Sequence, residues 1–312
     1  MPAAESRGLT AIGIDIGATK VLGGVVDVGT GAVLHAEEIP ALPRRDPVTV
    51  LDDVLGLAER MRDAAARDRL TVRGLGVGIA EIVDPNGEIT TRNTFDWLDL
   101  PVHQRFGEVA SPVVIESDVR AAACAEARYG AGRGLDTFAY VTIGSGISSC
   151  LMIKGRPLVG HTGGAIVLTS ATTRERCPGC GETHDFCLEA YASGLGMTRR
   201  YAEATSRDVQ RTEEIFDAAA SGDVKAVHVI ESAAQALGKA LAQLANLFDP
   251  AAIVLGGGLG SAAGLYHDRL IESARRQIWH GPVRWLPIVS AELGTASGLV
   301  GAALRGAEGL VR

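Results

Sequence analysis

Residues 11–27 read AIGIDIGATKVLGGVVD, and their pattern is the strongest indication of the fold class. Two apolar runs lie on either side of a turn at Gly17, which predicts two strands joined by a tight connection. The same pattern returns at residues 137–153, TFAYVTIGSGISSCLMI, with its turn at residues 144–146. Because a strand–turn–strand unit occurs twice, we expect an internal repeat of two α/β domains around a cleft.

Further elements surround each repeat unit. Apolar spacing and small-residue-rich stretches predict helices over 48–66, 119–129, 226–248 and 295–308. β-Branched and glycine-rich runs predict strands over 30–37, 74–83, 111–118 and 252–255. We place a small α/β domain at residues 1–118 and a large one at residues 119–312, with a C-terminal helix that is able to pack back on the small domain.

The composition is that of a globular protein. Of the 312 residues, 46% are hydrophobic and 21% are charged, which excludes a disordered chain. The net charge of −7 repels a phosphate backbone, so we expect no nucleic-acid partner. No apolar run approaches the ~20 residues that cross a bilayer, and residues 1–9 do not form a secretory signal. We therefore expect a cytoplasmic protein without a membrane partner.

Three glycine-containing loops are candidates for binding phosphate. In the first, Gly17 permits a tight turn whose N–H groups can point toward an anion, Thr19 adds a hydroxyl and Lys20 a positive charge. Asp15 precedes this turn and can hold Mg²⁺ or its water ligands. The matching loop of the second repeat and a loop after a buried strand complete the set: Gly144, Ser145 and Gly146, and Gly256, Gly257 and Gly258. One such loop is weak evidence, whereas three in this order favour phosphate binding.

The chain resembles the ROK family, which comprises repressors, open reading frames and sugar kinases of the actin-like superfamily. The matching pieces are IDIGATK at 14–20, SD at 117–118, GSGI at 144–147, CLE at 187–189 and LFDPAAIVLGGG at 247–258. The resemblance implies two actin-like domains around a nucleotide cleft, with ATP phosphates at the first two glycine loops and adenosine near the third. Repressor members carry a DNA-binding domain before the first strand, and we expect none here because that strand begins near Ala11.

Asp118 is the candidate catalytic base. It ends a buried strand and precedes a helix, at the edge of the sheet where open α/β folds bind ligands. A carboxylate there can accept the proton of a hydroxyl that attacks the γ-phosphate. The residue type alone favours a helix N-cap instead. The resemblance reverses that preference, since kinases of the family carry their base at this position.

The sugar-binding motif of the family is largely rewritten in this chain. Its kinases have Ala-Gly-Glu-x-Gly-His after the second phosphate loop, and the Glu and His fall here on Val167 and Ser170. Ser117 replaces an amide that usually contacts sugar, whereas Glu189 retains a sugar-contacting position. A pocket that has lost those polar groups disfavours ordinary glucose. The candidates for replacement contacts are Glu81, Glu116 and His161.

The resemblance and the intact phosphate loops predict an ATP- and Mg²⁺-dependent kinase that phosphorylates a hydroxyl of a small polyol. The substrate is expected to be a non-standard hexose, an amino sugar or a sugar-like cyclitol, since C7-cyclitol kinases have relatives in the family. Two alternatives stay open: a catalytically silent nucleotide- or ligand-binding protein, and an ordinary glucokinase. Retention of Asp118 argues against the silent protein. The resemblance also leaves a homodimer open.

A cysteine cluster is the candidate metal site. Five cysteines without a secretory signal argue against a disulfide framework. Cys177 and Cys180 form a CxxC knuckle, and Cys187 follows seven residues later. Thiolates at this spacing suit a structural Zn²⁺, with His184 as the fourth ligand and His161 as its competitor. The alternative is a group of reduced thiols.

Overall fold

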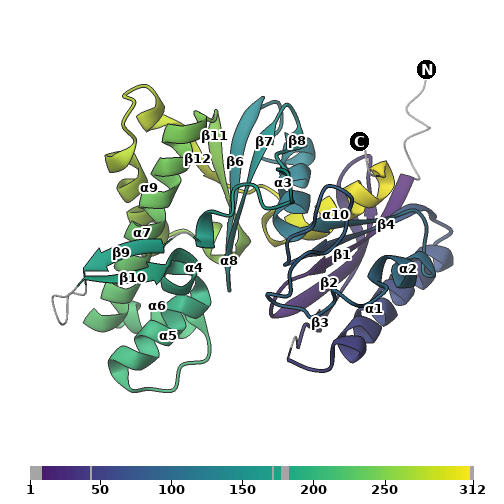
Figure 1. Ribbon diagram of the computed structural model, residues 1–312, viewed down its shortest axis with the longest axis horizontal. Coiled ribbons are helices and arrows are strands. Elements are labelled where there is room, and N and C mark those ends of the chain that lie inside the picture. The colour runs from purple at the N-terminus through teal and green to yellow at the C-terminus, as the bar shows by residue number, and fades with distance from the viewer. Residues whose placement is uncertain (1–8, 43, 171, 177–182, 310–312) are drawn as a thin grey trace. The chain divides into compact units, whose positions relative to one another are not determined.

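The computed structural model describes residues 9–42, 44–170, 172–176 and 183–309 of the chain. Its internal contacts divide the chain into two units (Figure 1). The first holds the residues up to Gly134, residues 152–165 and those from Thr295 onward, and the second holds residues 135–151 and 166–294. This division differs from the boundary expected at residue 118, and it groups the C-terminal helix with the first unit.

The first unit is built on a five-stranded sheet. In chain order its strands are β1 (Leu9–Ile16), β2 (Lys20–Asp27), β3 (Ala32–Pro40), β4 (Thr71–Ile79) and β5 (Val113–Ser117). Their order in the sheet is β3-β2-β1-β4-β5. Antiparallel pairing joins β1 to β2, and parallel pairing joins β1 to β4 and β4 to β5. The carboxyl ends of β1, β4 and β5 therefore meet at one edge of the sheet.

Two helices cover opposite faces of this sheet, α1 (Pro47–Arg67) and α10 (Ser297–Glu308). Neighbouring residues of a strand point to opposite faces. A Cβ on Gly23 would meet Leu57 of α1 at 2.7 Å, and one on Gly24 would meet Leu299 of α10 at 2.9 Å. The paired glycines of β2 thus let both helices pack closely. The unit also contains α2 (Val102–Gly107), α3 (Asp118–Tyr129) and β8 (Arg156–Pro157).

The second unit holds four neighbouring strands of the other five-stranded sheet, in the order β12-β11-β6-β7, and β8 is the fifth strand of that sheet. In chain order its strands are β6 (Thr137–Ile143), β7 (Ile147–Ile153), β11 (Ala252–Gly256) and β12 (Ile288–Ser290). Parallel pairing joins β11 to both β6 and β12. A separate hairpin consists of β9 (Thr172–Arg176) and β10 (Thr183–Cys187).

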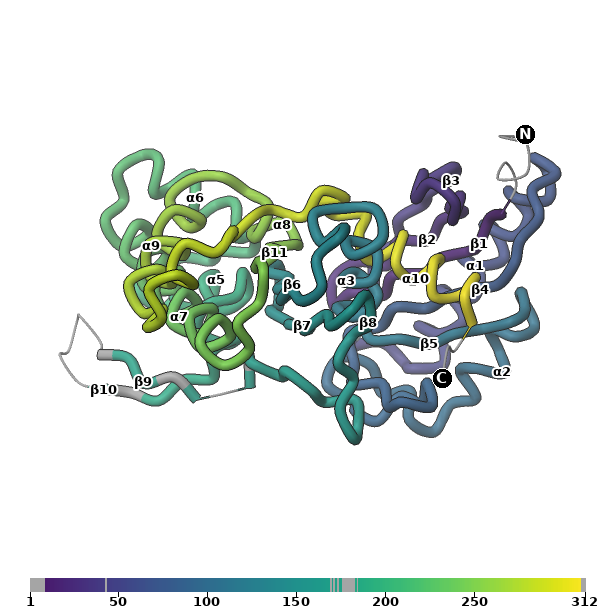
Figure 2. Tube along the Cα trace, turned by 90° about the horizontal axis from the view of Figure 1, so that it is seen from above, coloured from purple at the N-terminus to yellow at the C-terminus, as the bar shows by residue number. Residues whose placement is uncertain are grey.

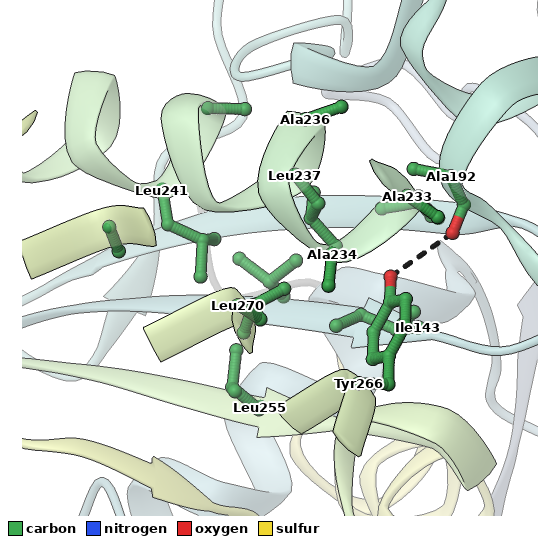
Figure 3. Packing of buried hydrophobic residues seen from close by; sticks show 14 of the residues in the cluster. Ile143, Ala192, Ala233, Ala234, Ala236, Leu237, Leu241, Leu255, Tyr266 and Leu270 are labelled. Carbon is green, nitrogen blue, oxygen red and sulfur yellow. Dashed lines mark hydrogen bonds between the residues drawn. The ribbon is translucent and has the colours of Figure 1, made fainter. Parts of the chain in front are cut away.

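Helices provide most of the core of the second unit. They are α4 (Leu188–Ala192), α5 (Gly194–Thr205), α6 (Thr212–Ala220), α7 (Val224–Phe248), α8 (Gly257–Gly260) and α9 (Leu265–Gln277). The long helix α7 packs along α9 (Figure 2). Figure 3 shows Leu237 and Leu241 of α7 in the buried cluster with Leu270 of α9, and the Tyr266 hydroxyl donates to the Ala192 carbonyl at 3.1 Å.

The α/β class and the helices expected over 48–66, 119–129, 226–248 and 295–308 are confirmed, with ends that shift by one or two residues. The strand expected over 74–83 ends earlier, at Ile79. The hairpin of β9 and β10 was not anticipated, because its short polar strands lack an apolar alternation. Among the described residues, no helix is both long and apolar enough to span a bilayer.

Candidate functional site

Two aspartates lie at the carboxyl edge of the first sheet. Asp15 is the penultimate residue of β1, and Asp118 opens α3 directly after β5. Strand β4 lies between β1 and β5 and contributes Gly78. A Cβ at Gly78 would lie 3.5 Å from the Asp118 Cα and 3.7 Å from Oδ1 of Asp15. The two aspartates therefore flank the same glycine, as the shared edge of parallel strands predicts.

Both carboxyl groups have raised pKa values. Burial raises the pKa of Asp118 to about 6, while hydrogen bonds from the Val119 N–H and the Ser117 side chain and the positive charge of Arg120 lower it, and the negative charge of Glu81 raises it slightly. Burial raises the pKa of Asp15 to about 7, with the charge of Asp118 as the second cause. Two buried carboxylates that repel each other are able to bind a cation or to accept a proton.

The helix-cap alternative does not account for Asp118. The N-cap position of α3 belongs to Ser117, and Asp118 is the first helical residue. Oδ1 of Asp118 accepts a hydrogen bond of 2.6 Å from the N–H of Val119. That contact orients the carboxylate at the end of the sheet and leaves Ser117 beside it.

The first glycine loop forms the tight turn that the sequence predicts. The Gly17 N–H donates to the Lys20 carbonyl at 3.0 Å. Thr19 and Lys20 are exposed, and Nζ of Lys20 forms a 2.8 Å ion pair with Glu38 on β3. Because the pair is exposed, it is weak enough for Lys20 to exchange Glu38 for a phosphate.

Of the three replacement contacts, Glu81 and Glu116 are engaged within the protein. The carboxylate of Glu81 accepts four hydrogen bonds of 2.5–2.9 Å, from the Thr91 hydroxyl and from the N–H groups of Asn93, Thr94 and Phe95. Glu116 is buried and accepts from Arg120 at 2.6 Å. His161 is exposed, in the same unit. Glu81 and Glu116 therefore hold neighbouring backbone and side chains in place near Asp118 through these hydrogen bonds.

The second glycine loop connects β6 to β7 in the other unit. Its Gly144 carbonyl accepts from the N–H of Gly194 at 2.8 Å, at the start of α5. Glu189, which the resemblance assigns to sugar, contacts this loop: its Oε2 accepts from the N–H of Ile147 at 2.8 Å. A Cβ on Gly146 would lie 2.8 Å from the same oxygen. Ser145 lies between the two glycines and is partly exposed.

The third glycine loop begins where β11 ends, and Gly256 pairs with Thr142 near the end of β6. Gly257 has a φ of +76°, and a Cβ there would lie 2.5 Å from the Ile143 carbonyl. Only glycine satisfies both conditions. Gly258 follows in α8 with open space around its Cα. The second and third loops therefore lie at neighbouring strand ends of one sheet.

Most of the proposed zinc ligands lie outside what the structure describes. This holds for Cys177, Cys180 and the side chain of His184. Cys187 pairs with Thr172 at the end of the hairpin, whereas the residues that flank the 177–182 connection pair at the other end. Across the described ranges, no three His, Cys, Asp or Glu side chains are grouped to hold a metal ion.

A shallow hollow of about 640 Å³ lies beside α9, lined among others by Arg275, Arg284 and Trp285. None of the residues that the sequence predicts for phosphate, base or sugar lines it, so it is separate from the candidate site.

Sequence reasoning missed three residues that shape the site: Gly78, Gly298 and Arg120. A Cβ on Gly298, in the first turn of α10, would lie 2.3 Å from Oδ2 of Asp15. Arg120 is buried two residues after Asp118. The signal that could have indicated Arg120 is a charged residue in an otherwise alanine-rich first half of a helix, two positions after the candidate base.

Comparisons with known proteins agree with this architecture. Residues 11–305 match the model of the ROK family. A glucokinase of Streptomyces coelicolor is 31% identical over 95% of this chain and 96% of the relative. An N-acetylmannosamine kinase of Salmonella heidelberg is 25% identical over 95% of this chain and 98% of the relative. The crystal structure of a ROK family glucokinase from Streptomyces griseus, in complex with glucose and AMPPNP, superimposes with a TM-score of 0.80 at 32% identity, covering 96% of this chain and all 100% of that chain. The actin-like fold that the resemblance implied is confirmed.

Proposed function

The chain belongs to the ROK family, and from this premise we propose that it is an ATP-dependent sugar kinase. The observation that carries the proposal is the pair of Asp15 and Asp118 on either side of Gly78, at the carboxyl edge of the first sheet. The resemblance assigns the catalytic base to the position of Asp118, and the affinity of carboxylates for Mg²⁺ beside a phosphate loop assigns the cation to Asp15.

We assign the proton transfer to Asp118. With a pKa of about 6, the carboxyl group is mostly ionised at neutral pH. This pKa is also close enough to 7 for the carboxylate to accept a proton from a sugar hydroxyl. The Val119 N–H holds the carboxylate in place. We propose that Asp15 holds Mg²⁺, because a bound cation would relieve the repulsion between the carboxylates of Asp15 and Asp118. ATP supplies the γ-phosphoryl group, and Mg²⁺ neutralises phosphate charge.

We assign the glycine loops to the nucleotide. Gly17, Thr19 and Lys20 would contact phosphate groups. Residues 144–146 would also contact phosphate, and residues 256–258 would lie against the adenosine. Glu189 supports this role of the second loop, since its carboxylate holds the N–H of Ile147.

The acceptor class follows from what replaces the sugar motif. Val167 is exposed by 44% and offers no hydrogen bond from its side chain, and the Ser170 hydroxyl donates to the Val167 carbonyl at 3.2 Å. We therefore propose a hexose variant, an amino sugar or a sugar-like cyclitol, with Ser117 and His161 as acceptor contacts. The N-acetylmannosamine kinase among the relatives is consistent with an amino sugar.

A second candidate is ordinary glucokinase activity. The relatives of 31% and 32% identity are glucokinases, which favours glucose directly. Retained Glu189 would then contribute to glucose binding in place of the lost pair. A silent binding protein is less favoured, because Asp118 keeps the geometry and the raised pKa of a base.

The experiment is ADP formation from ATP and Mg²⁺ with a panel of acceptors: glucose, mannose, N-acetylhexosamines, inositols and valiolone-type cyclitols. We expect turnover with one class. Glucose as the best acceptor would support the glucokinase, and ATP binding without turnover on any acceptor would contradict the kinase.

We also propose a structural Zn²⁺ bound by Cys177, Cys180 and Cys187, with His184 as the fourth ligand. The donor set of three thiolates and an imidazole suits zinc chemically, and Cys187 lies at the end of β10. Elemental analysis of the purified protein tests this: about one zinc per chain supports it, and zinc-free protein of full activity contradicts it.

A further inference from the structure

We propose that Arg120 is a positioning residue that clamps the acceptor side of the site next to Asp118. The proposal rests on the kinase function proposed above, and it adds a determinant of acceptor binding that lies outside the phosphate loops. All the residues involved belong to the first unit.

The guanidinium of Arg120 serves three acceptors on separate segments. Nε donates to Oε1 of Glu116 at 2.6 Å, Nη1 to the Gly163 carbonyl at 2.7 Å and Nη2 to the Val83 carbonyl at 2.6 Å. The residue is only 4% exposed. Only arginine offers this fixed fork of donors, so lysine cannot replace it at all three contacts.

The two segments that Arg120 joins are packed backbone to backbone. Gly163 has a φ of +86°, and a Cβ there would lie 2.1 Å from the Val83 carbonyl. The Ala165 N–H donates to the Val159 carbonyl at 3.2 Å and closes the segment into a loop. His161 is exposed within this loop. The clamp therefore fixes the backbone on which His161 is carried.

Glu116 holds the other side of the clamp. Its Oε2 lies 3.7 Å from Arg305 of α10, so the buried carboxylate is placed between two arginines. A buried ion pair contributes little net stability compared with apolar residues, but it does fix geometry. Glu116 belongs to β5 and Arg120 to the first turn of α3, so their ion pair lies on both sides of Asp118 in the chain.

This arrangement gives Arg120 a defined effect. It connects the first turn of α3, which carries Asp118, to the loops at Val83 and Gly163. The base and the backbone that would contact the acceptor are thereby held in a fixed relative position. Loosening the clamp misplaces the acceptor relative to Asp118, and a shift of that kind costs rate and acceptor affinity. The three hydrogen bonds described for Arg120 go to Glu116, Val83 and Gly163 and to none of the glycine loops, so we expect ATP binding to be spared.

The test compares Arg120→Lys with Arg305→Lys, which perturbs the same Glu116 without touching Val83 or Gly163. For each protein we would measure the KM for acceptor, the KM for ATP, the thermal midpoint, and hydrogen exchange of amides in 80–90 and 159–165. For Arg120→Lys we expect the acceptor KM to rise about tenfold and the ATP KM to change by less than about twofold. Exchange should accelerate in both segments but not in 144–147.

Arg305→Lys should leave both KM values within about twofold of the parent, because lysine keeps a positive charge beside Glu116 and the three hydrogen bonds of Arg120 remain. Glu116→Gln, which keeps an acceptor for Nε, is the milder variant if Arg120→Lys fails to fold, and it should raise the acceptor KM in the same direction. The proposal is overturned if Arg120→Lys leaves exchange in 159–165 unchanged, or raises both KM values equally. Absence of turnover in the unmodified protein contradicts the kinase instead, and the exchange result still decides whether the clamp exists.

Discussion

Gly298 lies directly against the carboxylate of Asp15, since a Cβ at Gly298 would come within 2.3 Å of Oδ2. The contact joins the first turn of α10 to the end of β1. A flexible carboxylate can move away from a new methyl group, whereas backbone atoms cannot. The relationship therefore links the packing of a helix to the position of the proposed metal-holding residue.

Gly298→Ala should abolish most of the activity without unfolding the protein. Alanine is favoured over glycine inside a helix by about 1 kcal/mol, and the added methyl group displaces Asp15. We expect a fall in kcat of at least about tenfold with an unchanged or higher thermal midpoint. Gly56→Ala is the matched control, because it adds the same methyl group inside α1, where its Cβ would meet only Arg60 at 3.5 Å. Equal activity of the two variants would refute the steric argument.

Removing the charge of Asp15 should stabilise the protein at high pH. Its pKa of about 7 in the folded chain exceeds the ordinary 3.8, so its ionisation favours the unfolded state. This penalty is absent below pH ~3.8, grows as the pH rises and is complete above about 7. Asp15→Asn should therefore raise the free energy of unfolding by about 1–3 kcal/mol at pH 8, allowing for partial exposure. The gain should shrink toward pH 5, as urea unfolding at both pH values would reveal, and a gain independent of pH would contradict the assignment.

The pH dependence of turnover should report Asp118. Its pKa of about 6 means that the base loses its ionised form as the pH falls through that value. We expect kcat/KM for the acceptor to drop about tenfold per pH unit below about pH 6. A profile that stays flat down to pH 5 would exclude a base with this pKa. The pH series requires an ATP concentration that saturates at each pH.

Glu189 separates the phosphate-loop role from the sugar role. Glu189→Ala removes the acceptor of the Ile147 N–H, and we expect the KM for ATP to rise about tenfold because the loop loses its support. Glu189→Gln keeps an oxygen for that N–H and should have a smaller effect on ATP. If the residue contacted only sugar, both variants would raise the acceptor KM and leave the ATP KM unchanged.

Much of the fold could be predicted because the elements carry clear periodic patterns. The run before Gly17 and the run before Gly144 define two central strands, and the apolar spacing of 226–248 defines α7. The proposed base could be placed at a strand end for the same reason. The hairpin of β9 and β10 could not be predicted, since its strands are short and polar and show no alternation of apolar and polar residues.

The side-chain contacts of the site were harder to predict because they depend on tertiary packing. Glu81 was expected to face the substrate, yet its four hydrogen bonds join it to residues 91–95, ten or more positions away. The partners of Arg120 at Val83 and Gly163 are 37 and 43 positions away. No local spacing encodes such pairs, so only a fold reveals them.

The most direct test of the kinase is the amount of phosphorylated acceptor that the chain and Asp118→Asn form with ATP and Mg²⁺, followed by ³¹P NMR. Nucleotide binding, measured separately by calorimetry, serves as the control for folding. We predict that the variant binds ATP like the parent and forms product about 10²–10⁴ times more slowly, because it lacks the base. Product formation by Asp118→Asn at the parent's rate would contradict the assignment of Asp118 and with it the proposed mechanism.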